Sequence, residues 1–549
     1  VAVKGASTAT MTNAEGNYSL AASGTSTLVF TAVGYVTQEV AVQGRSVVNL
    51  QLEEDNTLLD EVVVTALGIQ REKKSLGYAV QELKGSELVE ARETNLANAF
   101  SGKVAGLQVV RSSNGAGGSS KIVLRGNTSL TGNNQPLIVV DGIPIDNFTG
   151  SSNNDYWNTG LDMGNGLGDI NPEDIQSLSV LKGPSAAALY GSRAGNGVIL
   201  ITTKSGRKQP GLGLTFSTTL GTENIFMKPE RQTSFAQGDN DIYDPMSNNS
   251  WGPKITGQSV TKWDGSTGPL QIHDNVSEFL RNGTNQNYSL GLQQQYGSTG
   301  IYSSISYLED RSIIPNNKLT RLNFSTRATT SFGADNRWTS DVKFAYNNTA
   351  GYNRPINGRD RSSVYTLYTL PQTINIADFS AATNQFGNML WYPGALAWTP
   401  NPYWLAQYNL NQDTRNRFIM NGSLKYAFTD WLDAEVKVGG DLYSTSGDER
   451  TWSGSPMANR YATNKKTFSE VNYTALLKAV KDNVIGKLGG NFTLGGNLMN
   501  RQWTSLGANA GALEVPNLFK IDNYKTGNLT LDQGIEKKKI NSVFASLGI

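Results

Sequence analysis

The sequence contains no cysteine and a single histidine, His273. Without cysteine, neither disulfide bonds nor thiolate chemistry is available to the protein. One histidine excludes a zinc site built from several histidines and argues against a Ser-His-Asp triad. A secreted enzyme is therefore disfavoured, although paired carboxylates stay open as a catalytic arrangement that composition does not exclude. His273 itself is interpreted as an exposed loop residue rather than a ligand.

A strong charge bias and long apolar runs are absent as well. The 47 basic and 46 acidic residues give a formal charge of +1, and no basic stripe indicates a nucleic-acid partner. No run of about 18 apolar residues occurs, so no membrane-spanning helix is expected. A β-barrel needs no such run, because half of each strand faces a polar lumen. Composition therefore does not exclude the membrane.

What the second half of the chain does contain is a repeated alternation of apolar and polar residues. Between residues 321 and 332, Leu322 and Phe324 alternate with Arg321 and Asn323. In a strand these sets point to opposite faces, which is the pattern of a transmembrane antiparallel β-barrel. We predict about ten such strands, at residues 214–222, 285–295, 300–308, 320–332, 337–347, 415–428, 431–443, 468–480, 484–494 and 540–549.

The connections between these segments are of two lengths. Short turns at 297–299 and 335–336 alternate with long connections at 223–284, 348–414 and 496–539. This asymmetry is typical of the two ends of an outer-membrane barrel. Aromatic residues near the predicted strand ends are expected to form interfacial girdles. They are Tyr302, Tyr307, Phe332, Trp338, Tyr346, Phe428, Trp431 and Tyr443.

Two folded segments are predicted before the barrel. Residues 1–55 favour a small β-sandwich that is incomplete at its N-terminus, with five strands at 1–3, 18–20, 28–32, 38–42 and 47–52. Residues 75–207 favour an α/β domain with a helix at 87–99 and a short helix that Asn171 caps and Pro172 begins. Its strands are expected at 78–83, 106–110, 121–125, 137–140, 177–181 and 198–203.

The fold class is thus mainly β, with an α/β domain in front of the N-terminal part of a transmembrane barrel. A barrel wide enough to hold the 75–207 domain needs about 22 strands, whereas about ten are recognisable. We therefore expect the sequence to be the N-terminal part of a longer protein.

The linker at residues 56–74 carries a short β-prone stretch around Val62, Val63 and Val64. An extended segment of this kind can add to the sheet edge of another protein by β-augmentation. An ordinary buried strand of a neighbouring domain is the alternative interpretation.

Several motifs resemble those of TonB-dependent outer-membrane transporters. Residues 60–66 (DEVVVTA) resemble a TonB box, and residues 137–144 (LIVVDGIP), 170–175 (INPEDI) and 181–199 resemble plug motifs. Their form is similar to the SusC-type branch, the RagA/SusC family of Bacteroidetes-like bacteria. Members of that branch also carry a carboxypeptidase-regulatory-like sandwich, which residues 1–55 would form. The resemblance implies a linker with the TonB box at 56–74, a plug at 75–207 and a barrel portion from 208–549.

The resemblance implies an importer in the outer membrane of a Gram-negative bacterium rather than an enzyme. Its cargo would be oligosaccharides or similar nutrients, and the plug would gate the barrel. The implied partners are TonB with its ExbB/ExbD energising complex, a SusD-type lipoprotein lid and outer-membrane lipid, with a dimer of SusC–SusD pairs as one possible assembly. Peptides, a chelated metal or cobalamin are alternative cargoes, and a signalling surface receptor is an alternative role. The TonB-binding residues would be Leu59, Asp60, Glu61, Val62, Val63, Val64 and Thr65.

Candidate substrate contacts lie in two aromatic segments. Tyr156 and Trp157 stand in the Gly/Asn-rich stretch 147–168, and Trp391, Tyr392 and Trp398 stand in the long connection 348–414. Aromatic faces suit sugar rings and peptide side chains alike, and packing of the loop or contact with a lid subunit is the alternative role.

Two further groups of charged residues are candidates for other contacts. Arg125 and Arg193 could make plug–barrel charge contacts or remain solvated. Asp239, Asp241 and Asp244 could ligate calcium through oxygen, although their spacing does not match an EF-hand, and a solvated loop is the alternative. No other cofactor is expected.

Overall fold

The protein is described from a computed structural model of the full chain. The structure describes residues 1–6, 8–13, 16–32, 35, 37–52, 62–64, 70–72, 80–90, 92–115, 117–130, 133–148, 157, 160–182, 190–485 and 488–548. The chain divides into two compact units, Val1–Val80 and Gln81–Ile549, which are described separately. Among the described residues no helix has the length and apolar character needed to cross a membrane.

The first unit contains a three-stranded antiparallel sheet. Its strands follow the order β1 (Ala2–Val3), β2 (Thr27–Phe30) and β3 (Gln38–Ala41). The prediction of five strands is wrong for the described residues at 18–20 and 47–52, which are not strands. These segments still line the core of Leu28, Phe30, Val42 and Val48. They hold their place by side-chain contacts rather than by ladder hydrogen bonds, as when the Tyr18 hydroxyl donates to the Val48 carbonyl at 2.7 Å.

A separate two-stranded sheet follows in the linker. It consists of β4 (Val62–Val64) and β5 (Gln70–Glu72), paired antiparallel with Val63 opposite Arg71. Among the described strands, β4 pairs with β5 alone. One of its edges therefore carries no partner from the described part of the chain.

The second unit begins with a five-stranded sheet in the order β10-β9-β12-β11-β6. β12 runs parallel to β9, while β10 and β11 pair antiparallel with their neighbours β9 and β12. A separate antiparallel hairpin joins β7 and β8. The strands are β6 (Val80–Lys84), β7 (Leu107–Arg111), β8 (Ser120–Leu124), β9 (Leu137–Val140), β10 (Ile143–Ile145), β11 (Ile175–Leu181) and β12 (Val198–Thr203).

Only short helices accompany this sheet. The helix predicted at 87–99 is instead two pieces, α1 (Gly85–Val89) and η4 (Leu96–Phe100), because the Asn95 side chain accepts from the Ala97 N–H and starts a new turn. The predicted start at Asn171 is confirmed, since its side chain accepts from the Glu173 N–H of η6 (Pro172–Asp174). The remaining pieces are η5 (Gly166–Asp169) and η7 (Gly191–Ala194).

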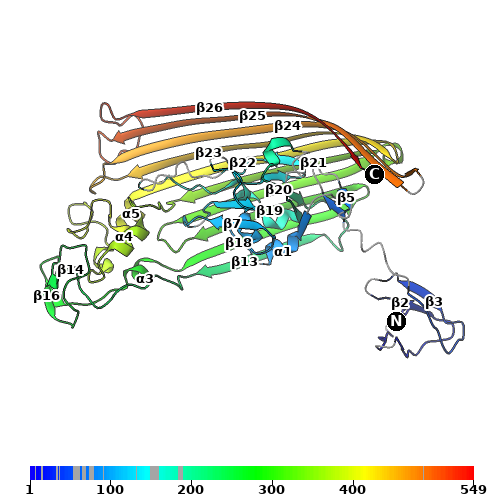
Figure 1. The fold of residues 1–549 in the computed structure, drawn as a ribbon, viewed down its shortest axis with the longest axis horizontal. Helices are drawn as coiled ribbons and strands as arrows, with labels where there is room; N and C mark the ends of the chain where they lie inside the picture. Colours follow the sequence, from blue (N-terminus) through cyan, green and yellow to red (C-terminus); the bar gives the residue numbers. More distant parts are fainter. Residues whose placement is uncertain are drawn as a thin grey trace. The chain divides into compact units, whose positions relative to one another are not determined.

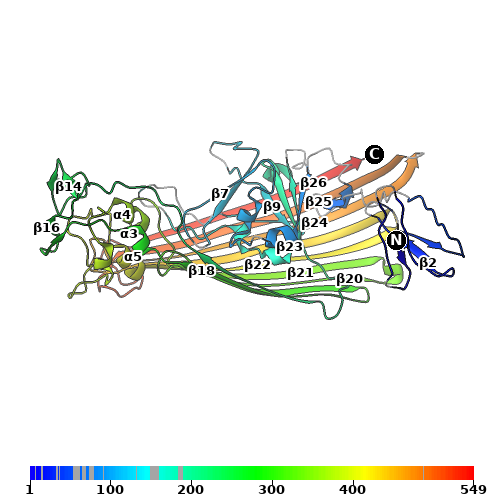
Figure 2. The same cartoon turned by 90° about the horizontal axis from the view of Figure 1, so that it is seen from below.

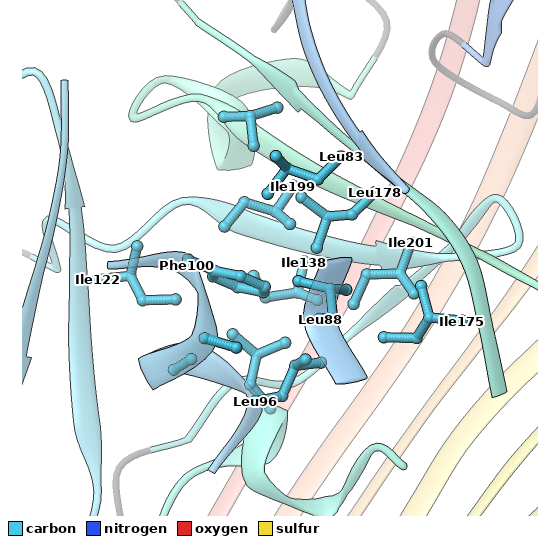
Figure 3. Close-up of a cluster of buried hydrophobic side chains, with 14 of the residues drawn as sticks. Leu83, Leu88, Leu96, Phe100, Ile122, Ile138, Ile175, Leu178, Ile199 and Ile201 are labelled. Atoms are coloured by element: carbon cyan, nitrogen blue, oxygen red, sulfur yellow. The ribbon is translucent and has the colours of Figure 1, made fainter. Parts of the chain in front are cut away.

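An apolar core joins these elements. Leu88, Leu96 and Phe100 from the helical pieces point toward Ile138 and Ile199 from the sheet, as Figure 3 shows. Phe100, Leu88 and Ile199 are each 0% exposed. Residues 81–207 therefore carry a hydrophobic core of their own.

The rest of the unit is a ten-stranded antiparallel sheet in which each strand neighbours the next in sequence. Figures 1 and 2 show it as a long curved wall with the α/β elements lying against one face. The strands are β13 (Leu214–Glu223), β18 (Gly283–Tyr296), β19 (Thr299–Arg311), β20 (Lys318–Phe332), β21 (Trp338–Tyr352), β22 (Asn409–Thr429), β23 (Leu432–Thr451), β24 (Arg460–Ile485), β25 (Leu488–Ala512) and β26 (Thr530–Gly548). The predicted number and places of the strands are confirmed.

The predicted strand lengths, however, are too short. β24 has 26 residues and β25 has 25, where the alternation marked segments of about a dozen. Most of the missed parts lie at the end of the sheet where the long connections gather. An example is Asn464, Lys465 and Lys466 in β24, where polar residues follow one another. Alternation stops there because neither face needs to be apolar.

The sheet has one apolar and one polar face. A row of facing residues across five strands, Leu290, Ile305, Phe324, Tyr346 and Phe418, lies on the outer face. The neighbouring row carries polar side chains and faces the α/β elements. It consists of Ser289, Ser306, Asn323, Asn347 and Arg417. The two faces thus match lipid on one side and a polar lumen on the other.

Two of the aromatic residues predicted for the interfacial girdles lie elsewhere. Tyr302 and Tyr443 are 4% and 8% exposed and face the α/β elements, where their hydroxyls donate to Asp174 and Asp146. Their positions in the alternation place them on the inner face. Phe332 and Trp338, by contrast, stack near a short turn with ring centroids 6.3 Å apart.

The long connections gather at one end of the sheet, as Figure 1 shows. They contain three helices, α3 (Asn275–Phe279), α4 (Ser363–Thr369) and α5 (Pro402–Tyr408), and the short helix η9 (Ile376–Phe379). Phe279, Leu367, Ile376 and Phe379 form their shared apolar core. Four short strands extend them: β14 (Gly238–Asp239), β15 (Ile242–Tyr243), β16 (Ser259–Thr261) and β17 (Thr267–Pro269). A further turn, η8 (Ala334–Asn336), closes the opposite end between β20 and β21.

Candidate functional site

The α/β elements meet the sheet through buried ion pairs, of which Asp169 in η5 is the centre. Arg415 of β22 donates to both of its carboxylate oxygens, at 2.6 and 3.0 Å. Arg417, two residues further along the same strand and therefore on the same face, donates to it at 3.2 Å. All three side chains are at most 2% exposed. Burial by itself would raise the pKa of Asp169, but the two guanidinium groups outweigh it and the pKa is lowered.

The two arginines also satisfy backbone carbonyls of the α/β elements. Arg415 donates to the Met163 carbonyl at 2.9 Å, and Arg417 donates to those of Gly166 and Asp146 at 2.9 and 2.8 Å. Arg417 in addition forms a bidentate pair with Asp441 of β23, with both distances 2.8 Å. Because these donors are used, the desolvation of the charges is largely compensated.

A second buried carboxylate, Asp141, ends β9 and reaches the neighbouring strands. It accepts from Lys343 of β21 at 2.7 Å and from Arg327 of β20 at 3.1 Å. It also accepts from the N–H and the hydroxyl of Thr203, which fixes the turn to β12. Burial opposes ionisation, but Lys343 and Arg327 lower the pKa of Asp141 well below its usual range. It is therefore a charged contact at every physiological pH.

A third carboxylate, Asp174 in η6, meets only hydroxyl groups. Tyr302 and Ser304 of β19 donate to it at 2.8 and 2.6 Å. No ion pair to Asp174 occurs among the described residues, and burial raises its pKa. Asp174 therefore contacts β19 through hydrogen bonds rather than through an ion pair, and burial favours its protonated carboxyl.

The structure places the two predicted contact arginines differently. Arg193 in η7 forms a bidentate pair with Glu470 of β24, at 2.7 and 3.0 Å. Arg125 is exposed, and within the described part of the chain its side chain forms no hydrogen bond or ion pair. Its backbone has a positive φ of 58°, and its N–H donates to the Gly106 carbonyl.

The aromatic residues predicted to contact cargo are brought together only in part. The guanidinium of Arg359 lies between the rings of Trp157 and Trp398, 3.8 and 4.5 Å from their centroids. Trp157 comes from the α/β segment and Trp398 from a long connection, so this stack joins the two. Tyr156 lies outside the described residues.

The other two predicted aromatics belong to the core of the long connections. Tyr392 is 2% exposed, and its hydroxyl donates to the Ser247 carbonyl at 2.8 Å. The indole N–H of Trp391 donates to the Thr399 carbonyl at 2.7 Å, and its ring packs on Phe379. In this arrangement Tyr392 has no surface for a cargo molecule, because its ring holds the loop together.

The three aspartates considered as calcium ligands do not form a metal site. Asp239 accepts from the Asn249 side chain, and Asp244 accepts from the Met246 N–H. Within the described ranges no group of three or more His, Cys, Asp or Glu side chains could hold a metal ion. His273 lies in the 223–284 connection, and burial lowers the pKa of its imidazole.

Of the predicted TonB-binding residues, Val62, Val63 and Val64 form β4. Leu59, Asp60, Glu61 and Thr65 lie outside the described residues.

Sequence reasoning missed the residues that hold the α/β elements to the sheet. Asp169 follows a Gly-rich stretch and Arg415 stands between polar residues, whereas Arg417 falls on the polar side of the alternation. That signal places it on the inner face. Its partner lies 248 positions away, and no pattern in one sequence indicates it.

Comparison of the sequence with known proteins identifies the α/β elements and the sheet. Residues 72–198 match the family model of the TonB-dependent receptor plug domain, and residues 1–64 match that of the CarboxypepD_reg-like domain. The TonB-dependent receptor SusC of Bacteroides thetaiotaomicron is 32% identical over 349 residues, which is 63% of this chain and 32% of SusC. The chain carries the plug domain of TonB-dependent receptors and is similar to their SusC-type branch. The α/β elements are thus their plug, and the ten-stranded sheet is part of an outer-membrane β-barrel.

A second relative is similar in sequence, and a solved structure is similar in fold. The TonB-dependent receptor P26 of Formosa agariphila is 29% identical over 444 residues, covering 79% of this chain and 40% of P26. The RagAB peptide importer in its open-open state superposes with a TM-score of 0.68 at 18% identity, covering 89% of this chain and 54% of that one. The chain spans about a third to two fifths of the length of these curated relatives.

Proposed function

We propose that this chain works in the energy-coupled import of oligosaccharides across the outer membrane, with the plug gating the barrel. The observation that carries the proposal is the polar seam between plug and barrel. The plug has its own apolar core, yet it meets the inner face of the sheet through ion pairs such as those of Asp169 and Asp141. A domain held in this way blocks the lumen and can still be displaced, because water can replace its contacts.

The linker supports coupling to TonB. β4 is short and β-branched, and among the described strands it pairs with β5 alone. Addition of a strand uses backbone hydrogen bonds at such an edge. A pull on β4 would reach the plug along the chain, and local regions of proteins open at free energies from near zero up to the global value.

Substitution in β4 tests the coupling in cells that carry the full-length protein. Deletion of residues 59–65 should abolish uptake of labelled oligosaccharide and leave its binding at the cell surface unchanged. Val63→Pro should do the same, because proline removes the backbone donor and disfavours a strand. Val63→Ala keeps the backbone groups and serves as the matched control. Normal uptake by the deletion variant would refute TonB coupling.

The resemblance to the SusC-type branch implies the wider assembly. TonB with ExbB/ExbD would supply the force, and a SusD-type lipoprotein would close the outer end, where exposed Phe226, Trp251 and Phe386 offer apolar contact area. A dimer of such pairs is one assembly to test. Oligosaccharides are proposed because the sequence resembles the SusC-type branch, for which such cargo is expected. The RagAB peptide importer, which is similar in fold, keeps peptides as the alternative cargo.

Alternative cargoes are peptides and chelated metals or cobalamin, and a signalling receptor is the alternative role. Native mass spectrometry of the complex extracted in detergent distinguishes them. A co-purifying lipoprotein with bound sugar oligomers supports the proposal, whereas bound peptides or a metal chelate would replace oligosaccharide as the cargo.

A further inference from the structure

We propose that the outer end of the lumen carries a pocket for an acidic sugar unit of the cargo, built from Arg359, Arg361, Trp398 and Arg460. This inference rests on the proposed import of oligosaccharides and names their chemical class. The four residues line an open pocket of about 420 Å³. It lies where β23 ends at Thr451 and β24 begins at Arg460, beside the connection between β21 and β22.

The pocket belongs to the inner side of the barrel wall. Arg460 pairs in register with Thr451, and Glu470, further along the same strand, pairs with Asp441. Arg460 and Glu470 are an even number of residues apart, so their side chains share one face of β24. Glu470 contacts the plug through Arg193, and that face is therefore the luminal one.

The positive charge of the pocket is only partly compensated. Arg460 pairs with Glu449 at 2.7 Å, and Arg359 pairs with Asp360 at 2.7 Å. Arg361 makes no hydrogen bond or ion pair with any residue that the structure describes. A half-buried cation without a partner is costly, and a bound carboxylate would supply what is missing.

Two further observations indicate that Arg361 and Arg460 are available to bind a ligand. The backbone of Arg361 has a φ of 61°, a conformation that costs energy for any residue but glycine and that collects at ligand sites. The Nε of Arg460 is buried, and no partner for it lies among the described residues. Burial lowers the pKa of Arg361 and nearby Arg460 lowers it further, against the opposing effect of Glu449 and Asp360.

The aromatic wall favours a ring over a flexible chain as the group that carries the anion. Trp398 lines the pocket, and its ring stacks on the Arg359 guanidinium and remains 36% exposed. The exposed surface of Trp398 is flat and apolar beside a cluster of donors, which is the composition of a ligand pocket. A sugar ring with a carboxylate presents a flat face and an anion together, as this wall requires.

Calorimetric titration of the full-length protein in detergent tests the pocket. The probes are a uronic acid oligosaccharide, its carboxyl-reduced neutral counterpart of the same length, and an acidic peptide of equal charge. We expect the acidic oligosaccharide to bind, the neutral one to bind more weakly, and Arg361→Gln to weaken binding of the acidic one by about tenfold. Arg361→Lys should restore part of the affinity, which separates charge from folding.

Arg450→Gln is the matched control, because it removes the same charge from the neighbouring strand at the same end of the sheet. Arg450 pairs with Asp448 at 2.7 Å, and its register places it on the opposite face from Glu449. We expect binding of the acidic oligosaccharide to be unchanged in this variant. An equal loss in both arginine variants would mean that net charge alone attracts the cargo, and would overturn the pocket.

Two outcomes overturn the sugar class while leaving import intact. If the acidic and neutral oligosaccharides bind with equal affinity and Arg361→Gln leaves that affinity unchanged, the pocket does not recognise an anionic sugar unit. Binding of the acidic peptide alone, lost in Arg361→Gln, makes the pocket a peptide site. In both cases uptake in cells would still depend on residues 59–65, whereas uptake independent of them refutes the proposed import itself.

Discussion

The interior of the plug and the seam between plug and barrel are built from opposite materials. Inside the plug, Leu88, Phe100 and Ile199 form an apolar cluster, as Figure 3 shows. At the seam, Asp169 and Asp141 meet arginine and lysine side chains that are also buried. Apolar contacts lose their whole stabilisation when water enters, whereas ionic groups exchange one set of hydrogen bonds for another. We therefore expect that displacing the plug from the barrel wall, which we call loss of plug seating, costs less free energy than unfolding the plug.

The largest effect should follow from a cavity in the plug interior. Phe100→Ala is expected to destabilise the plug by about 3–5 kcal/mol, because the buried ring cannot be replaced by water or by its neighbours. Hydrogen exchange of plug amides in the intact protein measures this loss, and added salt should not change it. Leu130→Ala, at a fully exposed plug position, is the control and should shift exchange by less than about 0.5 kcal/mol.

A somewhat smaller effect should follow from uncharging the seam. Asp169→Asn leaves Arg415 and Arg417 buried without their shared anion, which we expect to cost about 3 kcal/mol of plug seating. Ion conductance of the protein in planar bilayers should rise, while exchange of the plug core stays slow. Asp162→Asn is the matched control, since that buried aspartate accepts from the plug residues Asn114, Ser119 and Gly164. An unchanged conductance in Asp169→Asn would contradict the idea that the ion pairs of Asp169 hold the plug in the barrel.

The smallest effect should come from Asp174, the seam carboxylate that has no ion-pair partner among the described residues. Its pKa is raised in the folded state, so its contribution to stability is fully present below the unfolded pKa of about 4 and is lost as pH rises through the folded value. Asp174→Asn keeps an oxygen for Tyr302 and Ser304 and carries no charge. We expect plug seating at neutral pH to change by less than about 1 kcal/mol, in the stabilising direction.

The pH profile sharpens this prediction. The wild-type protein should lose plug seating between acidic and neutral pH, and Asp174→Asn should lose less, as measured by conductance across that range. A steeper loss in the variant than in the wild-type protein would mean that Asp174 stabilises the seated plug in its charged form, against this expectation.

The sequence predicts the repeating parts of this fold and little of its unique contacts. Leu137–Val140 and Val198–Thr203 are predicted at their observed bounds because continuous apolar runs mark buried strands. The alternation likewise predicts ten strands and assigns Arg417 and Phe418 to opposite faces. These features are local, and the physical pressure behind each acts on neighbouring residues.

The parts that the sequence does not predict depend on distant partners or on the absence of a face to bury. Tyr18 and Leu50 belong to segments that pack on a core without joining a sheet. The seam needs residues such as Asp169 and Arg415, 246 positions apart, to meet. The stack of Trp157, Arg359 and Trp398 draws on two separate connections, so the sequence indicates the aromatics and not the guanidinium between them.

The length of β24 has a consequence for how an outside partner could reach this protein. Its 26 residues extend roughly 85 Å, and at a tilt of about 45° they rise roughly 60 Å, twice the hydrocarbon thickness of a bilayer. The whole bilayer with its headgroups is roughly 40–45 Å thick, so the strand exceeds it by roughly 15–20 Å. We place this excess at the Arg460 end, because the alternating part of β24 begins only near Phe468. A protein anchored in the same leaflet by an acyl chain would need a linker long enough to span this height before it could contact the opening of the barrel.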